Sequence, residues 1–255
     1  MRLTFGPSLF RYGVDRVNGV TNNTGVMGSK ERRERERDRM RTRILDAARD
    51  LFATEGYDAV SMRKIADAIE YSPTAIYVHF KDKAALMREL CNEDFGRMAE
   101  GNRRVFEMDD PVERIRELGD HYIRFAVRHP NHFRLMFMTR PSCEIEMSEE
   151  EMKQAGHGDP NQDGYALLRL CVQQAMDQKR FRPELTDIDV VTQLLWSGVH
   201  GVASLHICRS ENEKWCPWLG ADKLSRAMID LIFRGVLREG DPALTKSAGQ
   251  KEKRP

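Results

Sequence analysis

The most prominent feature of this chain is a helical spacing of apolar residues that recurs along most of its length. In the segment from about 31 to 55, the apolar residues between Ile44 and Phe52 recur every three or four positions and share one face. Gly56 follows and suits the left-handed end of a helix. The residues before Ile44 are almost all charged, so that part has no apolar face to bury. The pattern predicts one long helix that ends at Gly56.

Shorter helices are predicted after this one. Ser61 suits the N-cap of the first, and Ser72-Pro73 places a capping side chain and a proline at the start of the second. The break between them at Glu70–Tyr71 is tight, and Asp82 caps a further helix. Two short helices joined by a tight turn and braced by a longer helix form a helix-turn-helix arrangement.

The remaining sequence also shows helical spacing and no strand-like alternation of any length. Further helices are predicted over about 111–129, 133–137, 165–179, 187–208 and 222–238, with loops in the acidic stretch 143–163 and at 210–220. The predicted fold class is all-α, with an N-terminal three-helix helix-turn-helix domain followed by a helical bundle. The predicted organisation is a disordered N-terminal extension at 1–29, the helix-turn-helix domain at 30–83, the bundle at 84–238 and a disordered tail at 239–255.

Charge changes this picture in the segment 30–43, although the 255-residue chain has a net charge of only +1. This segment holds eight basic and four acidic residues. It is either a solvated helix with incomplete pairing of the Glu31–Arg35 kind, or a helix whose surplus arginines lie along DNA phosphates or the minor groove. In the second case each arginine contributes on the order of 1 kcal/mol at low salt, and the charge pattern favours this interpretation. The acidic stretch 143–163 could not face phosphates.

The cysteines and the hydropathy of the chain indicate the cellular compartment of the protein. The five cysteines are odd in number and lack CxxC spacing, so they indicate neither a disulfide framework nor a zinc ribbon; they are Cys91, Cys143, Cys171, Cys208 and Cys216. No apolar run approaches the roughly 20 residues of a membrane helix, and the N-terminus lacks the apolar core of a signal peptide. We therefore expect a cytoplasmic protein with no membrane partner, and translation that begins at Met27 rather than Met1.

Four sequence motifs together resemble the N-terminal domain of the tetracycline-repressor (TetR) family of bacterial transcriptional regulators. They are ILDAARDLF at 44–52, EGY at 55–57, SMRKIA at 61–66 and SPTAIYVHFKDK at 72–83. They cover about 45 residues in the family's order and without gaps, which is more specific than a general helix-turn-helix pattern. The family usually has glycine in the turn where this chain has Glu70, so a strained or different turn is expected there.

The resemblance implies that the segment 72–80 is a recognition helix that enters the major groove of an operator. Ile76 and Phe80 would hold this short helix on the hydrophobic core, and its small N-terminal residues would let it enter a groove about 12 Å wide. The alternative is that Tyr77 and His79 are ordinary surface residues. The DNA contacts implied are Ser61, Arg63, Pro73, Thr74, Ala75, Tyr77, His79 and Lys83.

The C-terminal half is similar to the WHG subgroup of TetR-family C-terminal domains, through WSGVHGVASL at 196–205 and RHPNHFRLMF at 128–137. The resemblance implies a ligand-binding and dimerisation bundle in which the last two helices pair with those of a second copy. A two-fold homodimer would place two recognition helices about 34–36 Å apart on a palindromic operator. The expected interface residues are Gly198, Gly201, Ser204, Met228, Leu231, Ile232 and Gly235.

A pocket for an unknown small apolar ligand is expected between the dimer helices and the DNA-binding domain. For any single candidate, a plain core role is at least as expected as ligand binding. The candidate lining residues are Phe125, Phe133, Met136, Phe137, Leu168, Met176 and Trp196. No cofactor and no metal site are expected.

The function predicted is therefore a ligand-responsive repressor, not an enzyme. A helical-bundle enzyme would need a nucleophile–base pair or a metal cluster, and the spacing of His129–His132 and His200–His206 supports neither. A regulator of the same family triggered by thiol oxidation or metal stays open, with Cys208 and Cys216 as the nearest cysteine pair. The expected mechanism is a population shift in which ligand moves the helix that begins at Asp82 and spreads the recognition helices.

Overall fold

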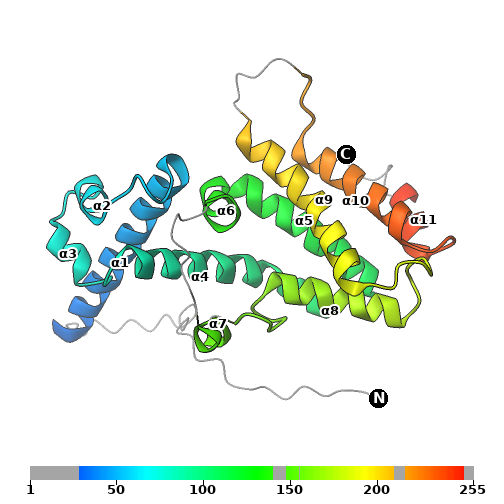
Figure 1. Cartoon of the computed structure of the whole chain (residues 1–255), viewed down its shortest axis with the longest axis horizontal. Helices are drawn as coiled ribbons and strands as arrows, with labels where there is room; N and C mark the ends of the chain where they lie inside the picture. The colour runs from blue at the N-terminus through cyan, green and yellow to red at the C-terminus, as the bar shows by residue number, and fades with distance from the viewer. Residues whose placement is uncertain (1–28, 140–147, 155, 210–215, 250–255) are drawn as a thin grey trace, which may run out of the picture. The chain divides into compact units, whose positions relative to one another are not determined.

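The computed structural model describes residues 29–139, 148–154, 156–209 and 216–249. Its regular elements are helices, apart from one isolated bridge between Phe181 and Leu237, and the predicted all-α class is confirmed (Figure 1). The helices are α1 (Ser29–Glu55), α2 (Met62–Ala68), α3 (Pro73–Tyr77), α4 (Lys83–Gly101), the 3₁₀ helix η1 (Arg103–Glu107), α5 (Pro111–Arg128), α6 (Pro130–Phe137), α7 (Glu149–Gln154), α8 (Gly164–Asp177), α9 (Ile188–Cys208), α10 (Ala221–Val236) and α11 (Pro242–Gly249).

The chain divides after Arg39 into two compact units. In the first, the described residues all belong to the start of α1, and those from 30 to 39 are exposed. The predicted disordered extension 1–29 lies outside the described residues, except that Ser29 begins α1. The second unit contains two hydrophobic cores.

The first core holds α1, α2, α3 and the start of α4 together. The fully buried Ile44 and Phe52 of α1 meet Ile65 of α2 and Ile76 of α3. Leu135 of α6 belongs to the same core although it lies far along the chain. Burial of such side chains stabilises this domain by about 1.5–3 kcal/mol each, which short helices such as α2 and α3 need.

Local capping defines the helix starts in this domain as predicted. The side chains of Ser61, Ser72 and Asp82 accept hydrogen bonds from the backbone N–H groups three residues onward, at 3.1, 3.3 and 2.7 Å. Each cap satisfies a donor that the first helical turn leaves without a partner. The third helix is nevertheless shorter than predicted, since α3 ends at Tyr77 instead of Phe80.

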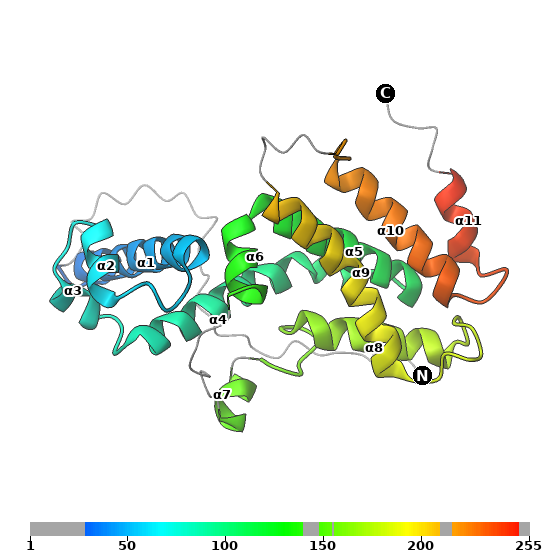
Figure 2. The same ribbon diagram turned by 45° about the horizontal axis from the view of Figure 1, so that its top comes forward.

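The second core is formed by α5, α8, α9 and α10, with α5 packed against the other three (Figure 2). Its fully buried residues include Phe133 of α6, Val172 of α8 and Val191 of α9. The helix α4 also contacts this bundle, because Met98 belongs to its core. Both α4 and α6 therefore contribute to the two cores.

Two expected loops or tails are wrong in part. The acidic stretch contains α7, where glutamates lie in the first turn and Lys153 in the last, an arrangement that suits the helix dipole. The tail after Glu239 contains α11, and Asp241 is fully buried beside Arg180, with hydrogen bonds of 2.5 and 2.8 Å. Burial alone would raise the pKa of Asp241, but hydrogen bonds from Arg180 hold it below its ordinary value. This ion pair orders the start of a segment whose polarity had indicated disorder.

Candidate functional sites

The α2–α3 surface exposes a group of side chains on helices that are pinned from behind. The side chain of Arg63 is 83% exposed, and Tyr77 and Val78 are 54% and 68% exposed. On the opposite side of α3, Ile76 is fully buried. Of the predicted DNA contacts, Ser61 and Thr74 are also exposed, and Pro73, Ala75 and His79 are partly exposed. Val78, which the sequence reading missed, is the most exposed apolar residue of this surface.

The side chain of Lys83 makes its hydrogen bonds within the protein. Its ammonium group donates to the backbone carbonyls of Tyr57 and Val60, both at 2.9 Å, and lies 4.1 Å from the centre of the Tyr57 ring. The charge is thus held by carbonyl oxygens and a π face within the protein. Lys83 ties the start of α4 to the loop before α2, and its role as a phosphate contact stays a prediction.

Two arginines of the basic segment 30–43 are also used within the protein. Arg41 pairs with Glu89 at 2.5 Å and lies over the Phe80 ring at 4.8 Å. Arg43 donates to the carbonyl of Ile69 at 3.3 Å. The structure therefore removes these two residues from the surplus of positive charge available to phosphates. The basic residues from 30 to 39 remain candidates.

The turn between α2 and α3 has a left-handed residue at Glu70, with φ of +61°. The N–H of Glu70 donates to the carbonyl of Asp67 at 3.2 Å, and the N–H of Tyr71 donates to Ala66 at 3.0 Å. This pair of bonds is the Schellman arrangement, whose first residue beyond the cap is left-handed. The expectation of strain at this residue is confirmed, and the hydrogen-bond pattern explains why glycine would suit the position.

A buried ionic network joins α1, α4 and α6. The carboxylate of Asp94 on α4 is completely buried, accepts from the Arg49 guanidinium of α1 at 3.2 Å, and lies 2.7 Å from His132 Nδ1 of α6. Asn131 of α6 adds a 3.0 Å hydrogen bond to Asp50 of α1. Because a buried charge without partners is costly, the three helices are held together at this point.

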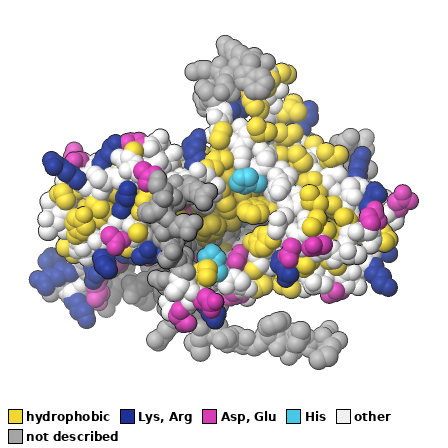
Figure 3. Space-filling view, in the orientation of Figure 1, with side chains coloured by type: hydrophobic (Ala, Val, Ile, Leu, Met, Phe, Trp, Pro, Cys, Tyr) yellow, Lys and Arg dark blue, Asp and Glu magenta, His cyan; other side chains and the backbone are white. Residues whose placement is uncertain are grey.

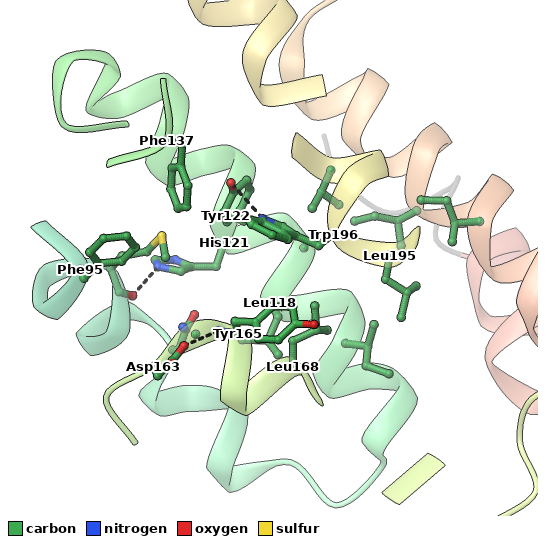
Figure 4. A pocket seen from close by; sticks show the side chains of 18 of the residues that line it. Phe95, Leu118, His121, Tyr122, Phe137, Asp163, Tyr165, Leu168, Leu195 and Trp196 are labelled. Atoms are coloured by element: carbon green, nitrogen blue, oxygen red, sulfur yellow. Dashed lines mark hydrogen bonds between the residues drawn. The ribbon is translucent and has the colours of Figure 1, made fainter. Parts of the chain in front are cut away.

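A mainly apolar cavity lies in the second core and reaches α4 (Figure 4). Together with the open space at its mouth, the cavity occupies about 820 Å³. Aromatic rings from six helices converge on it, since Phe95, Tyr122, Phe137, Tyr165, Trp196 and Phe233 come from α4, α5, α6, α8, α9 and α10. The other lining residues are Met98, Asn102, Ile115, Leu118, Gly119, His121, Asp163, Gly164, Leu168, Leu195, Val199, Ile229 and Ile232.

Hydrogen bonds among three residues order one wall of this cavity. The indole Nε1 of Trp196 can only donate, so the Tyr122 hydroxyl oxygen accepts from it at 3.1 Å. The hydroxyl of Tyr122 then donates to Nδ1 of His200 at 2.8 Å. Burial lowers the pKa of His200 and favours the neutral imidazole, whose Nδ1 accepts this hydrogen bond when the proton is on Nε2. The role of His200 is thus to orient Tyr122.

The predicted ligand residues divide into lining and core positions. Phe137, Leu168 and Trp196 line the cavity. Phe125 and Phe133 are instead buried in the surrounding core, and Met136 and Met176 pack partly buried against it. These four predictions are corrected, because the residues pack in the core instead of lining the cavity. The helical spacing showed that they lie on inward faces, but it does not distinguish a core residue from a residue of the cavity wall. The sequence analysis missed Asn102 and His121, since it gave no role to the end of α4 or to the polar positions of α5.

The predicted dimer residues divide in a similar way. A Cβ atom on Gly198 would lie 2.2 Å from Cδ1 of Ile232 and 3.6 Å from Cγ of Met228, so these three residues pack α9 against α10 within one chain. Ser204 is partly buried. Gly201, Leu231 and Gly235 are exposed, and Leu231 is 67% exposed. Apolar side chains also gather at the surface over α9 and α10 (Figure 3). The exposed apolar residues of α9 are Val190, Leu194 and Leu205.

The cysteines and acidic residues give weaker candidates for chemistry. Burial raises the pKa of Cys91 and of Cys171 to about 11, so these thiols are held protonated. Cys208 is exposed, whereas Cys143 lies outside the described residues. Within the part of the chain that the structure describes, no cluster of histidine, cysteine or carboxylate side chains could hold a metal ion, and no helix could cross a membrane.

Comparisons with known proteins agree with this architecture. The model described as bacterial regulatory proteins of the tetR family matches residues 44–90, and a tetracyclin repressor-like C-terminal domain model matches residues 115–210. The chain belongs to the TetR family of bacterial regulatory proteins. Neither description specifies the WHG subgroup, so that assignment stays a prediction.

Individual relatives resemble the chain over different lengths. The HTH-type transcriptional repressor Rv1474c of Mycobacterium tuberculosis is 49% identical over 59 residues, which are 23% of this chain and 32% of that protein. The chain thus matches about a third of the length of this curated relative. The structure of PfmR from Thermus thermophilus shares the fold with a TM-score of 0.58 at 22% identity, over 84% of this chain and all of that one. AibR, solved with isovaleryl coenzyme A and operator DNA, has a TM-score of 0.60 at 20% identity, over 76% and 97%.

Proposed function

We propose that this protein is a cytoplasmic transcriptional repressor that binds operator DNA through α2 and α3 and releases it when a small molecule occupies the cavity. The observation that carries the proposal is the α2–α3 surface, where exposed Arg63, Tyr77 and Val78 stand on helices held by a buried core. A helix presented in this way suits the major groove, and the name of the relative that matches this domain supports repression.

The face formed by α9 and α10 supports binding as a homodimer. An exposed apolar stripe of this kind is costly in water and is typical of a protein–protein interface. Two copies paired across it would present two recognition helices about 34–36 Å apart and would select a palindromic operator. Gly201 and Gly235 would permit close approach, because their Cβ positions face open space.

The helix α4 is proposed to carry the response from the cavity to DNA. Asp94 and Phe95 are neighbours on α4, one in the ionic network with α1 and the other in the cavity wall. A ligand that moved Phe95 would therefore act on the contact that fixes α4 against the DNA-binding domain. To lower DNA affinity, the ligand must bind the displaced position of α4 more tightly than the operator-binding one.

The substitution Tyr77→Ala tests the DNA-binding surface. Its operator affinity should fall at least about tenfold, because the exposed ring no longer reaches the groove. The operator is first found by sequencing genomic fragments that the protein binds, and affinity is then measured by fluorescence anisotropy.

The matched control is Phe106→Ala, which removes another exposed ring, from η1. It should bind the operator like the wild type, and both variants should keep the wild-type mass in light scattering. Wild-type operator affinity in Tyr77→Ala would show that α3 is not the recognition helix.

A further inference from the structure

We infer that the cavity binds a neutral, mainly apolar molecule that donates a hydrogen bond to the side-chain oxygen of Asn102, and that it rejects organic anions. This inference rests on the proposed function, since it names the chemistry of the molecule that the cavity would sense. It depends on the hydrogen-bond acceptors of the cavity wall that have no partner in the protein. It also depends on the absence of lysine and arginine from the described residues that line the cavity.

Asn102 is the first of these groups. It lies directly after α4, is only 5% exposed and lines the cavity. Its Oδ1 is buried and makes no hydrogen bond with the described part of the protein. A buried carbonyl without a partner is unusual in a folded protein, because it has lost its water and gained nothing in return. A ligand hydroxyl or N–H would supply the missing donor.

His121 adds a second acceptor to the same wall. Its Nε2 lies 3.1 Å from the backbone carbonyl of Met98, which can only accept, so Nε2 carries a proton. Burial lowers the pKa of His121 and favours the neutral ring, and the proton on Nε2 then leaves Nδ1 as an acceptor. A site that offers acceptors selects ligands that carry donors.

Two hydrogen-bond donors of the wall are used within the protein. Trp196 gives its indole N–H to Tyr122, and Tyr122 gives its hydroxyl proton to His200. A ligand carbonyl or carboxylate would have to break this chain of bonds to gain either of these two donors. The two acceptors and the two occupied donors point to the same ligand chemistry.

The charge of the wall excludes anions. None of the described residues that line the cavity is a lysine or an arginine. Asp163 lines it, and its carboxylate accepts from the backbone N–H groups of Tyr165 and Ala166 at 2.8 and 3.2 Å. A carboxylate or phosphate in the cavity would meet this negative charge without a cation to balance it.

The experiment compares three ligands of nearly equal shape in the full-length protein without DNA. N-phenyl-1-naphthylamine, a neutral fluorescent probe with one N–H, is bound first, and 1-naphthalenemethanol, 1-methylnaphthalene and 1-naphthoate then compete for it. The alcohol should compete about tenfold more strongly than the methyl compound, because only the alcohol donates a hydrogen bond. The naphthoate should be the weakest of the three.

The variant Asn102→Leu removes the acceptor at similar size. In this variant the alcohol and the methyl compound should compete within about twofold of each other, while the methyl compound should bind no more weakly than in the wild type. The control is Asn92→Leu, at an exposed position of the same helix, which should keep the tenfold preference.

The wild-type comparison decides the question even if Asn102→Leu does not fold. Equal competition by the alcohol and the methyl compound, or strongest competition by the naphthoate, would overturn the inference and leave the proposed repressor function standing. If neither the probe nor the three ligands bind, both the inference and the ligand-sensing part of the proposed function are wrong. Operator binding by the Tyr77→Ala variant tests the DNA-binding part separately.

Discussion

Glu70 occupies a left-handed backbone conformation that favours glycine, and the helix-turn-helix fold is kept. Its φ of +61° places its Cβ in a left-handed conformation that costs roughly 1–2 kcal/mol for most residues. The two backbone hydrogen bonds of the Schellman turn require this conformation, and the buried neighbours Ile69 and Ile76 hold the helices on either side. The turn therefore keeps its geometry and carries the strain.

The substitution Glu70→Gly should stabilise the protein by about 1 kcal/mol, because glycine adopts positive φ without the Cβ clash. The gain is partly offset by the greater freedom of glycine in the unfolded chain. The measurement is the free energy of unfolding from urea titration, and Glu70→Ala, which keeps the Cβ, should show no comparable gain. Equal stability of the glycine and alanine variants would mean that the turn is not strained.

The residues that sequence alone identified are those whose role is local. Ser61, Ser72 and Asp82 cap helices that begin one residue later, so their role depends only on nearby chain. Lys83 and Asn102 could not be interpreted in this way. The first finds its carbonyl partners more than 20 residues away, and the second lines a cavity built from several helices.

At the scale of elements, α4 is the helix on which the two cores depend. Leu86 and Leu90 near its start belong to the core of the DNA-binding domain, whereas Met98 near its end belongs to the core of the bundle. Between them, Asp94 binds α1 and α6. The periodicity of α4 shows that its apolar residues share one buried face. It does not show that the start and the end of that face belong to two different cores.

Breaking the ionic network should loosen this connection. The substitution Asp94→Asn leaves the buried guanidinium of Arg49 without its main counter-charge and should lower the free energy of unfolding by roughly 3 kcal/mol. The matched control is Glu93→Gln, whose half-exposed carboxylate lies 3.4 Å from the same arginine and should change stability by less than about 1 kcal/mol. Similar urea midpoints for the two variants would contradict a structural role for Asp94.

At the scale of the whole molecule, α9 and α10 expose apolar side chains that no other described part of the chain covers. Leu231 is 67% exposed at the centre of α10, and Leu205 is 54% exposed near the end of α9. The sequence indicated this face through its small residues, but Gly198 is used within the chain. Close packing of two helices favours small residues on adjacent turns, whether the helices belong to one subunit or to two. The positions of the small residues therefore do not show which kind of packing they serve.

The substitution Leu231→Glu should weaken dimerisation, with an increase in the dissociation constant on the order of 100-fold, since each interface would bury two charges. The measurement is sedimentation equilibrium, and the helical circular dichroism should stay unchanged because the residue is exposed in one chain. Leu170→Glu, at an exposed leucine of α8, is the control and should remain as dimeric as the wild type. An unchanged mass for Leu231→Glu would place the interface elsewhere.

The separation of the α2–α3 surface from the cavity has a consequence for engineering. The lining of the cavity includes no residue from α1, α2 or α3, and the exposed DNA-facing side chains include none from α5 or α8 to α10. A biosensor could therefore be retuned toward a new analyte by changing Leu168, Leu195 or Ile229 while its promoter is left unaltered. Both α4 and α6 contribute to the core of the DNA-binding domain and to the cavity wall, so substitutions in these two helices would alter the amplitude of the output along with its selectivity.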